Sequence, residues 1–198
     1  MFIRKLFIIL CFFLAIPLLT VAQEIKEEIE TSIDRSDMPE DAIELLDEFW
    51  PNRSDIDYYR ETDGETVTYE AKLEFRRYQY SIEFDQEGSV LDVEQLIEFD
   101  EIPEEARSEI TNDLEDQFSK YDITRIQRQF VTTETDEDDE DFIDDILEYD
   151  SEDYKIRYEI VVDGQSRREL GSFEMLYDRS GELIEKRRIL RRSLDNIW

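Results

Sequence analysis

The sequence predicts an α+β fold built from two tandem repeats, each a helix packed on a four-stranded antiparallel sheet. One observation is repetition: Asp37–Ala42 is echoed by Glu101–Ala106, and Tyr80–Gly88 is echoed by Phe173–Gly181. The other is periodicity, because each copy opens with a helical spacing of apolar residues and continues into strands in which apolar and polar residues alternate. No crossover helix separates the strands within a copy, which favours antiparallel pairing.

The first unit covers residues 37–100. A helix is expected from about Pro39 to Trp50, since proline suits a first helical turn and Pro51 ends the apolar stripe. Alternating strands follow, the clearest of them over residues 66–75. Each sheet is therefore expected to bury one face beneath its helix and to turn a polar face to water.

The second unit, residues 101–198, repeats this plan. Its helix starts near Pro103, and a turn is expected at Asp163-Gly164. An acidic insertion over residues 134–153 interrupts the unit between its first and second strands, and its acidic block is expected to be solvated because like charges repel.

The chain begins with features of a signal peptide over residues 1–22. Arg4 and Lys5 precede an apolar run of about 14 residues, and Thr20-Val21-Ala22 suits cleavage. The run is short for a membrane span, and no later segment is apolar enough to form one. We therefore expect an exported protein, periplasmic or secreted, with no membrane span after signal cleavage.

Residues 23–36 link the signal peptide to the first unit. Ile25, Ile29 and Ile33 recur at four-residue spacing among charged residues. This spacing is interpreted as a linker or a leading amphipathic helix.

The charge of the chain restricts its partners. Cleavage removes two basic residues and no acidic one, so the net charge of −31 becomes −33. Such a charge repels nucleic acids and anionic lipid surfaces. We expect an extracytoplasmic protein as partner, no nucleic acid, and a monomer.

Catalytic residue types are missing from the expected mature chain. It has no histidine, and Cys11, the only cysteine, lies within the signal peptide. Ser-His-Asp triads, thiol nucleophiles and typical zinc sites are therefore excluded. The scattered glycines form no phosphate-binding loop. We predict a protein that is not an enzyme, with no catalytic residues and no cofactor.

The acidic insertion suggests an alternative function, a calcium- or cation-binding envelope protein. Carboxylate oxygens suit Ca²⁺, and the candidate ligands are Asp136, Asp138, Glu140 and Asp141. An EF-hand pattern is not met, because Asp141 stands at the sixth position and Leu147 at the twelfth. Loose Ca²⁺ association is the competing interpretation.

A short helix is expected directly after the acidic block. Its apolar face comprises Phe142, Ile143, Ile146 and Leu147. These residues are candidates for folding into a partner's groove, or they pack back on their own domain.

The polar sheet face is a second candidate partner surface. It carries outward positions such as Glu70, Lys72 and Glu159. Affinity at such a surface depends on buried aromatic or arginine side chains, so Tyr59 and Tyr78 are candidates. The competing interpretation is that these are ordinary solvated strand faces.

The units resemble the PepSY-like exported bacterial proteins, which are related in fold to the β-lactamase inhibitory protein. The matching segments are Trp50-Pro51, Tyr69-Glu70-Ala71, Phe84–Gly88, Ile102-Pro103 and Tyr177–Gly181, within a span from about Asp37 to Leu190. The resemblance implies helix-plus-four-strand units that bind or inhibit another protein, such as an extracytoplasmic hydrolase or peptidase. It implies no catalytic residues, and the acidic insertion departs from its pattern.

Overall fold

The computed structural model describes residues 24–26, 29–51, 53–132, 138–148 and 155–189. The predicted signal peptide lies outside these residues. Ten strands form one sheet in the order β1-β10-β9-β8-β7-β6-β5-β4-β3-β2, and neighbouring strands are antiparallel except for the parallel pair β1 and β10. The α+β class and the antiparallel pairing are confirmed.

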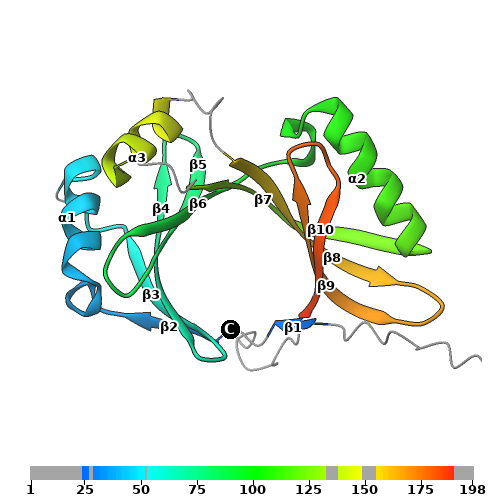
Figure 1. Cartoon of the computed structure of the whole chain (residues 1–198), viewed down its shortest axis with the longest axis horizontal. Coiled ribbons are helices and arrows are strands. Elements are labelled where there is room, and N and C mark those ends of the chain that lie inside the picture. The colour runs from blue at the N-terminus through cyan, green and yellow to red at the C-terminus, as the bar shows by residue number, and fades with distance from the viewer. Residues whose placement is uncertain (1–23, 27–28, 52, 133–137, 149–154, 190–198) are drawn as a thin grey trace, which may run out of the picture.

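The helices are α1 (Glu40–Phe49), α2 (Glu104–Gln117) and α3 (Asp139–Glu148), with short 3-10 turns at Arg35–Asp37 and Phe99–Glu101. The strands are β1 (Glu24–Lys26), β2 (Ile29–Ile33), β3 (Asp57–Asp63), β4 (Thr66–Phe75), β5 (Tyr78–Phe84), β6 (Val90–Leu96), β7 (Lys120–Val131), β8 (Lys155–Gln165), β9 (Leu170–Asp178) and β10 (Leu183–Ile189). Figure 1 shows a curved sheet with the helices on its outer side.

One sheet replaces the two sheets that the sequence predicts. Strands β6 and β7 pair from Asp92 with Val131 to Leu96 with Gln127, and this ladder joins the two halves of the chain. The pairing satisfies backbone groups that would otherwise form two sheet edges. Alternation within a strand does not reveal this contact, because it reports which face a residue takes and not which edge is paired.

Helices α1 and α2 begin in the same way. Each follows a proline, Pro39 or Pro103, and carries two acidic residues in its first turn. Acidic side chains there interact favourably with the positive end of the helix dipole. The apolar side of each helix is buried against the sheet, through Ala42, Leu45 and Leu46 in α1 and through Ala106, Ile110 and Leu114 in α2.

Two similar hairpin turns pack against the N-terminal ends of these helices. Asp85 Oδ1 accepts backbone N–H groups in the β5–β6 turn, and Asp178 Oδ1 does the same in the β9–β10 turn. Each turn contains a glycine with positive φ, at +100° for Gly88 and +89° for Gly181. A Cβ on Gly88 would lie 2.8 Å from the Ala42 nitrogen, and one on Gly181 would lie 2.4 Å from the Ala106 oxygen. Both turns therefore sit directly on the first turn of a helix.

The leading segment is a pair of strands, not the helix that the spacing of its isoleucines allowed. β1 pairs with β10, whereas β2 pairs with β3, so consecutive strands lie at opposite edges of the sheet. Residues four apart share a face in a strand as well as in a helix, which is why the spacing did not distinguish the two.

The turn expected at Asp163-Gly164 is also wrong. β8 continues to Gln165, and the chain turns at residues 166–169, where the Ser166 N–H donates to the Glu169 carbonyl. A Cβ on Gly164 would lie 2.6 Å from the ring of Phe118. This glycine admits the aromatic ring close to the strand and does not form a turn.

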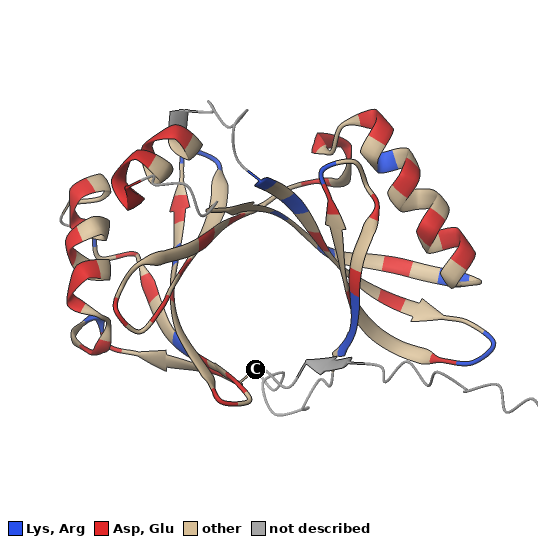
Figure 2. Cartoon of the chain, in the orientation of Figure 1, with Lys and Arg blue, Asp and Glu red and all other residues tan. Residues whose placement is uncertain are grey.

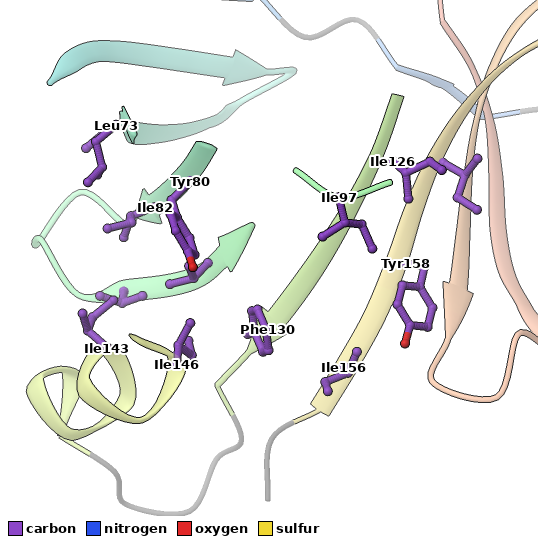
Figure 3. Packing of buried hydrophobic residues seen from close by; sticks show 14 of the residues in the cluster. Leu73, Tyr80, Ile82, Ile97, Ile126, Phe130, Ile143, Ile146, Ile156 and Tyr158 are labelled. Atoms are coloured by element: carbon purple, nitrogen blue, oxygen red, sulfur yellow. The ribbon is translucent and has the colours of Figure 1, made fainter. Parts of the chain in front are cut away.

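The described part of the acidic insertion packs on its own domain. Phe142, Ile143 and Ile146 of α3 are at most 3% exposed and belong to the main hydrophobic cluster. Figure 3 shows Ile143 and Ile146 directed toward the side of the sheet that carries Tyr80 and Ile82. The helix is therefore part of the core.

Candidate binding face

The concave side of the sheet carries the candidate binding site. All three helices cover the opposite, convex side (Figure 1). Along β5, Tyr80, Ile82 and Phe84 are buried in the hydrophobic cluster, whereas Ser81 and Glu83 line a cavity on the concave side. Strand alternation thus puts the apolar residues under the helices and the polar residues on the concave face.

The concave face encloses a cavity of about 720 Å³ lined by side chains from every strand between β2 and β10. We call it the acidic cavity, because nine of its lining residues are carboxylates and only three are cations. The carboxylates are Glu30, Glu61, Asp63, Glu70, Glu83, Asp92, Glu94, Glu159 and Glu174. Figure 2 shows the excess of Asp and Glu over Lys and Arg on the strands as well as on the helices.

Lys72 forms ion pairs with carboxylates on one side of the cavity, its first flank. Its Nζ lies 2.9 Å from Glu70 Oε2 and 3.0 Å from Glu30 Oε1, and 4.6 Å from the centre of the Tyr59 ring. Burial acts to lower the pKa of Lys72, but its pairs with Glu70 and Glu30 raise that pKa above the ordinary value. The buried Glu70 also accepts a hydrogen bond from the Ser81 hydroxyl. This flank shows an ammonium group held between two carboxylates.

Two arginines form ion pairs with carboxylates on the opposite flank of the cavity. Arg187 Nη2 on β10 lies 3.1 Å from Oε1 of Glu174, which is 3% exposed. Arg187 Nη1 also lies 3.9 Å from Asp63 Oδ2 on β3, so this side chain reaches across the concave face. Arg125 Nη2 lies 2.8 Å from Glu159 Oε1.

The middle of the cavity is acidic. Asp92 on β6 is half-buried and accepts a hydrogen bond of 3.0 Å from Gln129 Nε2, while Glu94 accepts one from Gln127 Nε2. Burial, followed by the charges of Glu83 and Glu159, raises the pKa of Asp92 to about 8. At neutral pH this group is therefore mostly an uncharged carboxylic acid.

Two amide oxygens in the cavity wall lack a hydrogen-bond donor among the described residues. They are Oε1 of Gln127 and Oε1 of Gln129, both buried. Each amide uses its nitrogen on a neighbouring carboxylate, which leaves its oxygen as an acceptor. Because both oxygens are buried, a ligand that brings N–H groups reaches them only after these side chains move.

One group of carboxylates is close enough to suggest a metal, among the residues the structure describes. Glu30, Glu61 and Glu70 each offer an oxygen within 4.8 Å of the others. Lys72 already forms ion pairs with two of them. An ammonium group in this position competes with a metal ion, so the group does not favour one.

The metal candidates of the acidic insertion lie at the start of α3. Asp136 is outside the described residues, and Asp138, Glu140 and Asp141 are exposed. Asp138 Oδ1 accepts from the Glu140 N–H at 3.4 Å. The neighbouring Asp139 Oδ2 accepts from the Val90 N–H at 3.1 Å. The Asp139 contact ties the helix start to β6, and the described candidates Asp138, Glu140 and Asp141 do not form a group with metal-ligand spacing.

The partner candidates are divided between the two sides of the sheet. Tyr59 lies on the concave side with Lys72, whereas Tyr78 packs against the core and donates from its hydroxyl to Glu101 Oε1 at 2.7 Å.

The hypothesis of a recognition helix is corrected. Phe142, Ile143 and Ile146 are buried, and the half-buried Leu147 packs beside them. Of the two interpretations of this apolar face, a partner's groove or packing on its own domain, the structure shows the second.

Sequence reasoning did not pick out Glu83, Asp92, Glu94, Glu174 or Arg187. In the sequence, these residues occupy polar positions of strands in which apolar and polar residues alternate. Assembling them required the order and curvature of the strands, because they come from four different strands.

This fold and face define a class: a curved antiparallel sheet backed by helices, with a polar concave surface. No family model and no curated protein matches the chain. Among solved structures, a DUF2874 family protein from Bacteroides ovatus is similar with a TM-score of 0.51 at 10% identity, over 76% of this chain and 87% of that one. A candidate periplasmic protein from Bacteroides eggerthii is similar with a TM-score of 0.52 at 11% identity, over 76% and 88%.

A BLIP-like protein from Bacteroides fragilis gives a TM-score of 0.49 at 12% identity, over 81% of this chain and 92% of that one, a likeness too weak to carry an argument. The other two likenesses show a shared fold, and the PepSY-like resemblance stays a prediction. In the part of the chain that the structure describes, no helix is long and apolar enough to span a membrane.

Proposed function

We propose that this chain is an exported, non-enzymatic binding protein whose concave face holds a basic segment of another extracytoplasmic protein. The observation that carries the proposal is the acidic cavity, with nine carboxylates against three cations. A concave surface of one charge sign attracts oppositely charged ligands and raises their association rate. Its volume of about 720 Å³ lies within the range of known ligand sites.

Export is supported by the expected signal peptide and by the candidate periplasmic protein that shares the fold. The finer proposal of inhibition comes from the PepSY-like resemblance. A basic loop held in the cavity would block an enzyme if that loop bordered the enzyme's active site.

We also infer that the two halves of the chain are copies of one unit. The support is the matching pair of turns, in which Gly88 and Gly181 lie against the first turns of α1 and α2. In each half a helix precedes four antiparallel strands.

The function can be tested with residues 23–198 and a fluorescently labelled peptide rich in lysine and arginine. Fluorescence anisotropy should show binding that weakens as salt rises, because screening shortens the reach of surface charges. A peptide of the same length rich in glutamate is the ligand control. The concave double variant Glu83→Gln/Glu94→Gln should bind the basic peptide at least about tenfold more weakly, a change of about 1.4 kcal/mol.

Exposed carboxylates on the convex helices provide a matched control. Glu44→Gln/Glu109→Gln makes the same charge change on α1 and α2, where both residues are exposed. We expect less than a twofold change in affinity for it. Equal losses in the two double variants would mean that net charge alone attracts the peptide, and the concave face would lose its assigned role.

A further inference from the structure

The middle of the acidic cavity differs from its flanks. Lys72 supplies a cation to Glu70 and Glu30 on one flank, and Arg187 supplies one to Glu174 on the other. Asp92 lies between them, on the strand that joins the two halves of the sheet. Its contacts there are mostly acids and amides.

The groups that face Asp92 come from its own strand and three others. Glu83 on β5 is paired with Asp92 in the strand register, and Glu94 is the next residue of β6 that faces the cavity. Strand β7 contributes the neutral amide of Gln129, and β8 contributes Glu159 and Arg157. Arg157 also acts on Asp92, with a smaller effect than the two glutamates, and Arg125 on β7 is paired with Glu159 at 2.8 Å.

Resting on the proposed function, we infer that the centre of the acidic cavity receives a single protonated amine or guanidinium group from the bound segment, and that its entry expels a proton from Asp92. The ligand is thus a lysine or arginine side chain, and Asp92 is the group that senses it.

The same cavity shows that an ammonium group fits between carboxylates of this spacing. Lys72 Nζ lies 2.9 and 3.0 Å from oxygens of Glu70 and Glu30, which are normal distances for charge-assisted hydrogen bonds. A guest nitrogen at Asp92 would find further acceptors in the unpartnered Oε1 atoms of Gln127 and Gln129 after small side-chain movements. An ammonium group has three donors and a guanidinium has five, so either can satisfy a carboxylate and an amide together.

The proton balance follows from the protein groups around Asp92. Burial and the charges of Glu83 and Glu159 raise the pKa of Asp92 to about 8, and the N–H of Gln129 and the charge of Arg157 offset this only in part. A cation beside Asp92 favours the carboxylate. On binding, the O–H bond of the carboxylic acid breaks, its electron pair stays on oxygen, and the proton passes to the buffer.

Binding should therefore strengthen as pH rises. Below about pH 8 part of the binding free energy is used to deprotonate Asp92, so affinity should rise by up to about tenfold per pH unit. Above that pH the dependence should level off. Lysine and arginine remain charged over this range, so the ligand does not cause the change.

The test is isothermal titration calorimetry of residues 23–198 with an N-acetylated hexalysine peptide, which lacks a titrating α-amino group, in buffers of different ionisation enthalpy. At pH 6.5 the buffer dependence of the heat should report about one proton released per peptide, and at pH 9 almost none. In Asp92→Asn the release should disappear and affinity should become nearly independent of pH. Asn keeps an oxygen to accept from Gln129, which favours correct folding.

The matched variant Glu94→Gln removes a neighbouring charge and keeps Asp92, so it should bind more weakly and still release the proton. Peptide binding without proton release, or equal release from Asp92→Asn, would overturn the inference and leave the proposed function standing. No binding of hexalysine at all would overturn both. Equal proton release with Ca²⁺ alone would assign the centre to a metal ion and also overturn the inference.

Discussion

Replacing Gly181 by alanine tests whether the β9–β10 turn is seated on α2. Gly181 has φ +89°, and an added Cβ would lie 2.4 Å from the Ala106 carbonyl oxygen and 3.0 Å from the Ala106 Cα. Both neighbours are backbone atoms of a helix, so neither can rotate away. The turn must instead move off the helix by about 1 Å to restore ordinary contact.

Gly64 provides the control that separates two costs. It has φ +60°, and nothing lies within 4 Å of an added Cβ. Gly64→Ala should lose only the conformational term, about 1–2 kcal/mol for an L-residue in the left-handed region. Gly181→Ala adds an overpacking term of about 1–3 kcal/mol, so its total should be about 2–5 kcal/mol.

Urea unfolding of residues 23–198, followed by far-ultraviolet circular dichroism, measures both free energies of unfolding. Gly88→Ala should resemble Gly181→Ala, because its Cβ would lie 2.8 Å from the Ala42 nitrogen. A loss for Gly181→Ala within about 0.5 kcal/mol of the loss for Gly64→Ala would refute the reasoning, since independent surface changes differ by no more than that.

Three further outcomes are expected. Phe142→Ala should lower the free energy of unfolding by about 3–5 kcal/mol because the ring is buried. Asp144 is exposed, so Asp144→Ala should change that free energy by less than about 0.5 kcal/mol. Similar small effects from both variants would contradict the placement of α3 in the core. The raised pKa of Asp92 means that its ionisation opposes folding. Asp92→Asn should therefore hardly change the stability of the protein at pH 4, and its stabilising effect should grow as the pH rises to 8. A difference in thermal unfolding that does not depend on pH would contradict this. Arg187→Met should lower the free energy of unfolding by about 2–3 kcal/mol at pH 7, because it leaves the buried Glu174 without that cation. A loss in urea unfolding below about 0.5 kcal/mol would contradict this.

Local patterns predicted the elements well where they were long and regular. The expected strand over residues 66–75 is β4, and the helix expected from Pro39 to Trp50 is α1 within one residue at each end. These predictions succeed because periods of 2 and 3.6 residues distinguish a half-buried strand from a half-buried helix. They failed at residues 29–33 and at Gly164, where the same pattern or residue suits two structures.

The candidate site was less predictable than the elements. Outward positions such as Glu70 and Glu159 were recognisable, but their grouping around one cavity was not. The apolar residues of α3 were recognised in the sequence, but their role was not, because a buried helix face and a partner-binding face have the same sequence pattern. Only their contacts with the sheet distinguish the two.

The amino-acid sequence by itself determined the long, regular elements, which side chains of their strands face the core, and how negative the chain is. The tertiary structure alone decided that β6 and β7 join the halves into one sheet, that α3 belongs to the core, and that nine carboxylates surround one cavity. The physical reason is range. Backbone preference and periodicity act over a few residues, whereas strand pairing, packing and the field at Asp92 sum contributions from strands far apart in the chain.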